Sequence, residues 1–396
     1  MILGIISSIN QLWRWKFAFG DNLMKKIMIL TASTGGGHNS AARAIVQAFE
    51  EKECKAIKID GIRAVSSVLD KIISDGYESS AKYTPKTYGK LYKLTDTQYL
   101  GDEHAVIINT LFKRGIKQLI REEEPDLIIG THPFPLMAAA KLKVKGKIQV
   151  PLMAVLTDYT THASWVRPGI DKYVVGADDM KFLLEEEGAK REQVHPLGIP
   201  VNPGFLDYGN LDEVKRDLKL KDRFTILLMG GSFGAGDMED FLEELLQLQG
   251  KYQIVAVAGR NKTLKAKMEK MAKVRGFEDK VRVLGFTSLV SELMTISDVL
   301  VTKPGGLTTT EAILKNIPIV IPFFIPGQEE ENVEFLLNHG LAVKTSRKYT
   351  LKVVIQSLME DKARLQAISK RMAHYAKPNS ADNITQLGLD LIKENT

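Results

Sequence analysis

Short apolar runs of strand length alternate with helical stretches along most of the chain. Before residue 200 the runs are KIMILT, AIKID, DLIIGTH, PLMAVLTD and KYVVGA, and after it they are FTILLMGG, QIVAVAG, VRVLGF, DVLVTKPGG and PIVIPF. Strands this apolar are typical of sheets covered by helices on both faces, and the alternation with helices predicts parallel βαβ units. The pattern therefore predicts two doubly wound α/β domains.

A cluster of Pro, Gly and Asn residues separates the two series of strands. The segment HPLGIPVNPGFLDYGN has the composition of an interdomain linker, which we place near residue 203. Ligands of doubly wound sheets bind outside the carboxyl ends of the strands, so we expect the two domains to face each other across a cleft. On this pattern alone, the last helical stretch, residues 379–394, fits either domain.

The middle of the first half has a different composition. Between residues 65 and 115 no convincing strand is present, and four lysines with no acid occur between Lys82 and Lys93. Tyrosines beside lysines suit the headgroup level of a membrane, but the same pattern fits a solvated helical face with half-buried tyrosines. The residues concerned are Tyr77, Lys82, Tyr83, Lys86, Tyr88, Lys90, Tyr92, Lys93 and Tyr99.

The N-terminal segment, residues 1–23, is apolar but interrupted by polar side chains. It is too broken for a transmembrane helix and lacks the basic start and cleavage site of a secretory signal. Its Trp and Phe residues beside Arg14 and Lys16 suit an interfacial anchor. Because Met24 directly precedes KKIMIL, the segment also fits an upstream extension.

Composition narrows the class of protein. The 396 residues are 44% hydrophobic and 26% charged, as in soluble globular proteins. The single Cys54 excludes a disulfide framework within the chain and no zinc pattern is present, which fits the cytoplasm. The net charge of +6 is spread along the chain, so we expect no nucleic-acid partner, whereas an anionic membrane surface stays open.

Three strands end in glycine turns that lead into helices: TASTGGGH, LMGGSFGAG and VTKPGGLTTTE. A glycine loop before a helix aims free backbone N–H groups and the positive end of the helix dipole at one point, which favours an anion. The two turns in the second half lie on strands that can be neighbours and favour a diphosphate. The first turn fits neither the dinucleotide nor the Walker spacing.

Two polar residues are candidates for proton transfer on the first domain. His38 lies at a helix start, where the dipole disfavours the imidazolium and leaves a neutral base, although a lone histidine is more often a capping or packing residue. Asp158 ends the strand PLMAVLTD and reaches the same edge of a parallel sheet. The two residues form either a base with its partner or two unrelated polar strand ends.

Acidic and amide residues of the second half also have two interpretations. Glu311 has capping-box spacing with Thr308, but its carboxylate also suits the hydroxyl pair of a ribose. Gln328, Glu329 and Asn332 follow a Pro-Gly turn, where they suit sugar hydroxyls or an exposed helix start with acids at its positive end.

Taken together, these motifs resemble a known family. GGGH, the Thr157-Asp158 pair followed by Trp165, GIPV, GGSFGAG, AGRN, TKPGGLTTTEA and PGQEEEN are similar to the motifs of the lipid glycosyltransferases of family 28. The resemblance is strongest to the processive diacylglycerol beta-glucosyltransferase and monogalactosyldiacylglycerol synthase type, and it extends from about Met24 to near the C-terminus. TKPGG, TEA and PGQE at this interval are specific, whereas GGGH alone is not.

The resemblance implies a GT-B fold, in which two Rossmann-like domains face each other across a cleft. It implies an acceptor and membrane-binding domain over residues 24–202 and a UDP-sugar-binding domain over residues 203–375. Residues 376–396 would form a C-terminal helix that returns to the first domain, and residues 1–23 lie outside the resemblance.

The resemblance also implies roles for individual residues. His38 would deprotonate the acceptor hydroxyl, with Asp158 as a supporting or alternative base. The UDP-sugar would contact residues of the second domain: Gly231 and Ser232 at the nucleotide, Arg260 and Phe286 at uracil and ribose, Gly305, Gly306 and Thr308 at the diphosphate, Glu311 at the ribose, and Gln328 and Glu329 at the hexose. The family often has a basic residue after the GxPV turn, where this chain has Asn202, so a phosphate contact from that position is not expected.

The implied activity is inverting transfer of glucose from UDP-glucose to diacylglycerol on the cytoplasmic face of the cell membrane, by a peripheral protein that docks through the segment from Tyr77 to Lys93. No DxD triplet is present, so we expect no metal and no further cofactor. The alternatives are the same chemistry with UDP-galactose, transfer of N-acetylglucosamine to a polyprenyl carrier, and a UDP-sugar-binding sensor without turnover.

Overall fold

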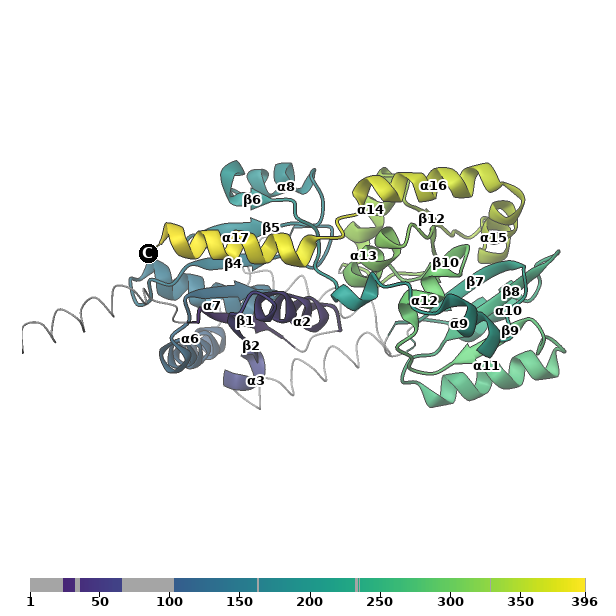
Figure 1. The fold of residues 1–396 in the computed structure, drawn as a ribbon, viewed down its shortest axis with the longest axis horizontal. Coiled ribbons are helices and arrows are strands. Elements are labelled where there is room, and N and C mark those ends of the chain that lie inside the picture. Colours follow the sequence, from purple (N-terminus) through teal and green to yellow (C-terminus); the bar gives the residue numbers. More distant parts are fainter. Residues whose placement is uncertain are drawn as a thin grey trace, which may run out of the picture.

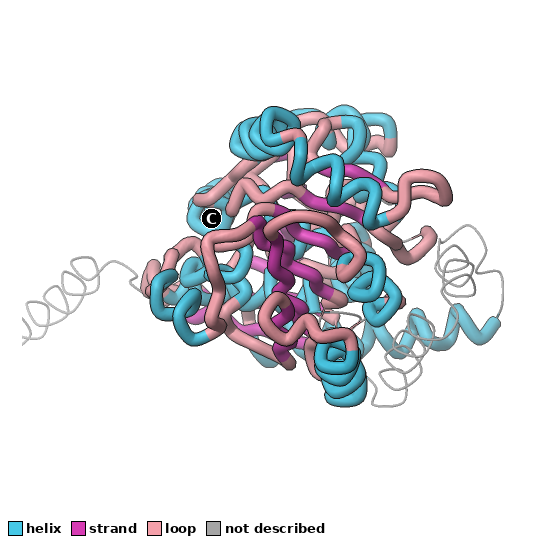
Figure 2. Tube along the Cα trace, turned by 90° about the vertical axis from the view of Figure 1, so that its right-hand side faces the viewer, coloured by secondary structure: helices cyan, strands magenta, loops and turns pink. Residues whose placement is uncertain are grey.

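The computed structural model describes residues 24–32, 36–65, 103–161, 164–231, 234, 236–327 and 329–395. It contains two six-stranded sheets, one in each half of the chain, and all neighbouring strands in both sheets are parallel. Helices enclose both sheets (Figures 1 and 2). The predicted class of two doubly wound α/β domains is confirmed.

The first sheet has the strand order β2-β1-β3-β4-β5-β6. Its strands are β1 (Lys26–Thr31), β2 (Lys55–Asp60), β3 (Leu127–Gly130), β4 (Leu152–Val155), β5 (Lys172–Val174) and β6 (Val194–His195). The accompanying helices are α2 (Gly36–Glu50), α3 (Gly61–Val65), α6 (Glu103–Glu123), α7 (Pro133–Val144), α8 (Met180–Glu186) and the 3-10 helix η1 (Arg191–Gln193).

The second sheet has the order β12-β11-β10-β7-β8-β9. Its strands are β7 (Phe224–Met229), β8 (Tyr252–Val257), β9 (Val281–Leu284), β10 (Val299–Thr302), β11 (Ile319–Ile321) and β12 (Ala342–Lys344). The remaining helices are η2 (Pro203–Phe205), α9 (Leu211–Asp217), α10 (Met238–Leu245), α11 (Lys262–Val274), α12 (Val290–Thr295), α13 (Gly306–Leu314), α14 (Glu330–Asn338), α15 (Leu351–Glu360), α16 (Lys362–Tyr375) and α17 (Ser380–Glu394).

All ten predicted apolar runs contain a strand, and two strands were not predicted. These are the edge strands β6 and β12, of two and three residues. Neither has an apolar run long enough to stand out in the sequence. The segment 1–23 and the tyrosine- and lysine-rich segment that includes Tyr77, Lys82, Tyr83, Lys86, Lys90, Tyr92 and Lys93 lie outside the described residues.

Strand β1 explains why these runs are apolar throughout. Ile27 and Ile29 pack with Phe49 of α2, whereas the alternate residues Met28 and Leu30 belong to the core on the opposite face. All four side chains are fully buried. Because successive side chains of a strand point to opposite faces, a strand covered on both faces has no position for a polar side chain.

The strand orders place one switch point in each sheet. In the first sheet the chain proceeds outward from β1 to β2 and then returns to β3 on the other side of β1. In the second sheet it proceeds from β7 through β8 to β9 and returns to β10 on the other side of β7. Ligands of such sheets bind at the carboxyl ends of the two strands that flank this point. The binding regions are therefore expected after β1 and β3 and after β7 and β10.

The last helix, α17, lies along the first sheet beside α2, although it follows α16 of the second domain (Figure 1). Its apolar face, which includes Ile384 and Leu391, joins the core formed by β1 and α2. The return crossing, residues 376–379, lies against the outward one: the Ser380 hydroxyl donates to the carbonyl oxygen of Gly198 at 2.7 Å. The chain therefore passes between the domains twice at one place. No described helix is long and apolar enough to cross a bilayer.

Replacing Ile384 by Ala is expected to lower the free energy of unfolding of the first domain by about 2–4 kcal/mol, because the fully buried side chain leaves a cavity between α17 and the sheet. Urea unfolding measures this change. Asn383→Ala, an exposed position on the same helix, is the matched control. Equal stabilities of the two variants would show that α17 does not contribute to this core.

Candidate active site

A cavity of about 340 Å³ lies between the two domains, where both switch points meet. The first domain contributes the start of α2 and the end of β4, and the second contributes the turns after β7 and β10. Most of the residues predicted for the site line this cavity: His38, Asp158, Gly231, Phe286, Gly305, Gly306, Thr308, Glu311 and Glu329.

Among the described residues predicted for the site, Arg260 is not one of those that line the cavity. Arg260 is exposed, and its guanidinium lies 4.9 Å from the centre of the Phe286 ring, at the rim of the site. Ser232 and Gln328 lie outside the described residues. Asn202, at the domain junction, accepts a hydrogen bond from the Gly204 amide at 2.9 Å.

His38 lies in the first turn of α2, and its hydrogen bonds fix its tautomer. Nδ1 is 2.8 Å from the carbonyl oxygen of Thr131 and 2.8 Å from the hydroxyl oxygen of Thr157. A carbonyl oxygen can only accept, so Nδ1 carries the proton and Nε2 carries the lone pair. His38 is thereby set up to accept a proton at Nε2.

The surroundings of His38 keep it neutral. Burial lowers the pKa of His38 below its ordinary value of 6.5, while the Asp158 carboxylate opposes this shift. The sequence predicted a neutral imidazole from the helix dipole, but burial is the main cause. The ring of His132, which sequence reasoning missed, meets that of His38 edge-on at 4.8 Å. Burial and the nearby His38 hold the pKa of His132 well below its usual range.

Asp158 is held by the second domain rather than by His38. Its Oδ1 accepts a hydrogen bond of 2.9 Å from the side-chain amide of Asn332 on α14. The oxygen of the same amide accepts a 2.8 Å bond from the backbone N–H of Tyr159. Asn332 is fully buried, so it does not read sugar hydroxyls, which was one interpretation of its position in the sequence.

The backbones of the two domains approach each other closely at Gly306. A Cβ atom at this position would lie 2.0 Å from the carbonyl oxygen of Thr157 and 2.7 Å from Oδ1 of Asp158. Only glycine fits between these groups, which explains the second glycine of TKPGG. Helix α13 therefore begins directly against the end of β4.

The start of α13 differs from the predicted capping box. Gly305 is the N-cap and makes no side-chain cap, so Thr308 lies within the first turn of the helix. Glu311 consequently does not cap the helix, and it lines the cavity instead. Burial raises the pKa of Glu311 to about 8. The free backbone N–H groups at the start of α13 give the cavity a positive end.

The buried carboxylate of Glu329 forms an ion pair with the partly buried Lys303 in the cavity wall. The Lys303 ammonium contacts Oε1 of Glu329, and the backbone N–H of Ile325 donates to Oε2 at 2.9 Å. Sequence reasoning missed Lys303, although it is the lysine of TKPGG and directly follows β10. Its Cε atom lies 3.5 Å from the position of a Cβ at Gly231, so it connects the turns after β7 and β10.

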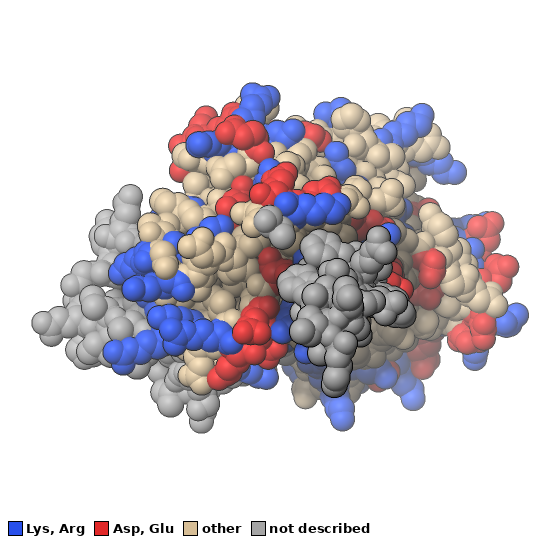
Figure 3. Space-filling model, turned by 60° about the vertical axis from the view of Figure 1, so that its left-hand side comes forward, with Lys and Arg blue, Asp and Glu red and all other residues tan. Residues whose placement is uncertain are grey.

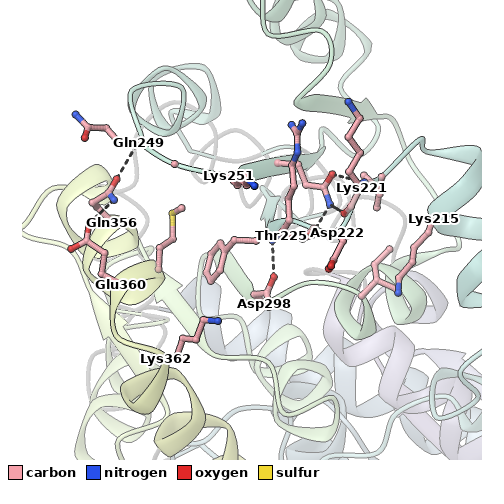
Figure 4. A pocket seen from close by; sticks show the side chains of 17 residues that line it. Lys215, Lys221, Asp222, Thr225, Gln249, Lys251, Asp298, Gln356, Glu360 and Lys362 are labelled. Atoms are coloured by element: carbon pink, nitrogen blue, oxygen red, sulfur yellow. Dashed lines mark hydrogen bonds between the residues drawn. The ribbon is translucent and has the colours of Figure 1, made fainter.

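A larger cavity, of about 1020 Å³, lies at the other end of the strands of the second sheet (Figure 4). It is formed at the amino ends of β7, β8 and β10, where the backbone N–H of Thr225 donates to Asp298 at 2.7 Å. Its charged side chains have both signs and include Lys221, Asp222 and Lys251. Because ligands of such sheets bind at the carboxyl ends, the smaller cavity between the domains is the candidate active site.

Within the described ranges, no group of three or more His, Cys, Asp or Glu side chains is arranged to hold a metal ion.

Comparisons with known proteins identify the family of the chain. Residues 38–201 match the model of the monogalactosyldiacylglycerol (MGDG) synthase family, and residues 212–377 match that of the glycosyl transferases group 1. The chain is 30% identical over 368 residues to the processive diacylglycerol beta-glucosyltransferase of Bacillus licheniformis, across 92% of this chain and 94% of that protein.

Solved structures share the fold. MurG of Acinetobacter baumannii has a TM-score of 0.63 at 15% identity, over 92% of this chain and 99% of that one. Anabaena HepE in complex with UDP-glucose has a TM-score of 0.51 at 14% identity, over 93% and 97%. Two parallel-sheet domains around a cavity define the GT-B fold. The chain belongs to the diacylglycerol glycosyltransferase family of the processive beta-glucosyltransferases and is a hexosyltransferase.

The raised pKa of Glu311 predicts a pH-dependent effect of Glu311→Gln on stability. Between pH 4.5 and about 8 the unfolded chain has released this proton but the folded protein retains it, so the wild type loses stability as pH rises. Glutamine does not titrate. As the pH rises through this interval, the free energy of unfolding of the variant should therefore increase relative to that of the wild type, by at most about 1.4 kcal/mol per pH unit.

Calorimetric melting temperatures at pH 5, 6.5 and 8 test this prediction. Glu278→Gln, at an exposed position, is the control and should follow the wild type at each pH. A constant difference between Glu311→Gln and the wild type at all three pH values would contradict it.

Proposed function

We propose that the protein transfers glucose from UDP-glucose to diacylglycerol, with inversion at the anomeric carbon and without a metal, at the cytoplasmic face of the membrane. One observation carries this proposal. A single cavity is lined on one side by His38 and on the other by the glycine turns after β7 and β10. A base and an anion-binding helix start on opposite walls are what a direct displacement requires.

On the acceptor side, His38 would act as the base. Nε2 takes the proton of the acceptor hydroxyl while the hydroxyl oxygen attacks C1 of the sugar. Asp158 lowers the energy of the imidazolium that forms, because its carboxylate raises the pKa of His38. The buried Thr131 carbonyl keeps the ring in the required tautomer.

On the donor side, the bond between C1 and the diphosphate oxygen breaks and its electron pair stays with UDP. The start of α13 and the Lys303 ammonium would stabilise this charge without a metal. Gly305, Gly306 and Thr308 at the start of α13 would hold the diphosphate, and Gly231 and Ser232 would line the nucleotide site. Glu311 would accept from the ribose hydroxyls, and Arg260 with Phe286 would lie beside the uracil.

The hexose would lie near the turn before α14, where Gln328 and Glu329 would read its hydroxyls. UDP-glucose as the donor is supported by the name of the Bacillus licheniformis relative and by the UDP-glucose bound to Anabaena HepE. UDP-galactose is the second candidate, because the first half of the chain matches the monogalactosyldiacylglycerol synthase model. The two sugars differ at one hydroxyl.

Docking on an anionic membrane is supported by a basic cluster on the first domain. Burial and the positive charges of Lys113, Arg167 and Lys145 lower the pKa of Lys141. These cations come from α6, from the end of α7 and from the turn before β5. Figure 3 shows Lys and Arg side chains gathered on one side of the first domain. The segment from Tyr77 to Lys93 remains the proposed membrane contact from sequence.

The donor and acceptor are tested by transfer of labelled sugar to diacylglycerol in anionic liposomes, with UDP-glucose and UDP-galactose in parallel and EDTA present. We expect glucolipid formation that EDTA does not reduce, with β-configuration in the proton NMR spectrum of the product. More than one product would show further extension. Formation of galactolipid alone would show that the donor is UDP-galactose. Absence of any lipid product with both donors would overturn the proposal.

His38→Ala should reduce kcat by about 10²–10⁴-fold, the range for loss of a general base. UDP affinity, measured by calorimetry, should stay within about threefold, because the histidine lies on the acceptor wall. His374→Ala, at an exposed histidine on α16, is the control. In the wild type, kcat/KM should fall on acidification with a midpoint below pH 6.5, where His38 becomes protonated. Unchanged turnover in His38→Ala would exclude it as the base.

A further inference from the structure

Asn332 is a fully buried amide at the boundary between the domains. It lies in the first turn of α14, three residues after Glu329. Both of its polar atoms are used across the boundary: Nδ2 donates to Oδ1 of Asp158 and Oδ1 accepts from the N–H of Tyr159. Two consecutive residues of the first domain are therefore held by one side chain of the second.

We propose that Asn332 is a positioning residue for the transfer reaction, which fixes the Asp158 carboxylate beside His38 and ties it to the helix that follows the proposed hexose-binding turn. The inference rests on the proposed function, in which Asp158 supports His38 as the base. Asn332 does not line the cavity, so it would act only through the residues that it holds.

The chemistry of the contact requires an amide. The carboxylate of Asp158 needs a donor, and the N–H of Tyr159 needs an acceptor. Among side chains of this length only asparagine offers both. An aspartate would place a second negative charge 2.9 Å from Asp158, and an apolar side chain would leave the buried N–H of Tyr159 and the half-buried carboxylate of Asp158 without this partner.

The position of Asn332 also links the cavity wall that would face the sugar donor to the wall that would face the acceptor. Glu329 is the N-cap of α14 and Asn332 lies within the same first turn, so a shift of this turn moves both. A donor that contacts the turn would therefore act on the acceptor-side carboxylate through a single hydrogen bond. Binding of the sugar donor would in this way fix the position of the Asp158 carboxylate beside His38.

Other contacts hold the same boundary together without Asn332. The ring of Tyr159 stacks on Phe335 at 4.4 Å, and its hydroxyl lies 3.1 Å from that of Thr310. Thr310 in turn donates to the carbonyl oxygen of Gly306 at 2.8 Å. We therefore expect variants at position 332 to fold with the domains still in contact.

The test is an NMR titration of His38 in protein labelled at histidine, with its signal assigned from His38→Ala. The titratable groups beside this ring are Asp158, which raises the pKa of His38, and His132, whose ring lies edge-on to it at 4.8 Å. Asn332→Leu should lower the pKa of His38 in the same direction as Asp158→Asn. The double variant should show no further shift beyond Asp158→Asn, because both changes act through one carboxylate. Asn338→Leu, an exposed position at the end of α14, should titrate as the wild type.

A pKa of His38 that is unchanged or raised in Asn332→Leu, or shifts that add in the double variant, would overturn the inference. This readout does not require turnover, so it decides the inference even if no lipid product is found. Conversely, full transfer by His38→Ala would contradict the proposed function and leave the titration result standing.

Activity provides a second readout. Asn332→Leu should reduce kcat by about 10–100-fold, with UDP affinity within about threefold and no further loss when combined with Asp158→Asn. A reversed pair, Asn332→Asp with Asp158→Asn, restores an amide-carboxylate hydrogen bond across the boundary. It should recover the melting temperature of the wild type but not its kcat. Recovery of both would show that the contact is structural only.

Discussion

The active site depends on a contact between two stretches of backbone. Gly306, at the start of α13, lies so close to the carbonyl oxygen of Thr157 that any side chain would separate the domains. Thr157 also bonds to His38, and Asp158 follows it in the chain. This one approach therefore sets the distance between the proposed base and the helix start that would hold the leaving diphosphate. Residues elsewhere in the cavity are placed relative to it.

The charges of the site are arranged so that little net charge is buried before the donor binds. Burial keeps His38 and His132 neutral and favours the protonated form of Glu311, while Lys303 is matched by Glu329. A buried charge without a partner would cost several kcal/mol, so neutrality or pairing stabilises the empty cavity. The start of α13 contributes a positive potential without a charged side chain, and it remains available to an incoming diphosphate.

Local features of the sequence predicted the strands and the glycine turns, because an apolar run or a turn depends only on its own residues. The two sheets and the ligand-binding edge followed from general rules of chain connection. The roles of Asn332, Lys303 and His132 did not follow, since each depends on a neighbour more than twenty residues away in sequence. Glu311 shows the limit of spacing rules. Its distance from Thr308 fitted a capping box, but the helix begins at Gly306 with Gly305 as its N-cap, and Glu311 lines the cavity.

The two passages of the chain between the domains have a mechanical consequence. They touch where Ser380 bonds to Gly198, at one end of the boundary, so a rotation axis through this place leaves both passages at constant length. Rotation about it separates α13 from β4 without stretching the backbone. The contacts that oppose this motion include those that Asn332, Tyr159 and Thr310 make across the boundary. The hydrogen bond between Asp179 and His339 opposes it as well. Release of a bulky nucleotide by this motion would then require these contacts to break, while the backbone of both passages keeps its length.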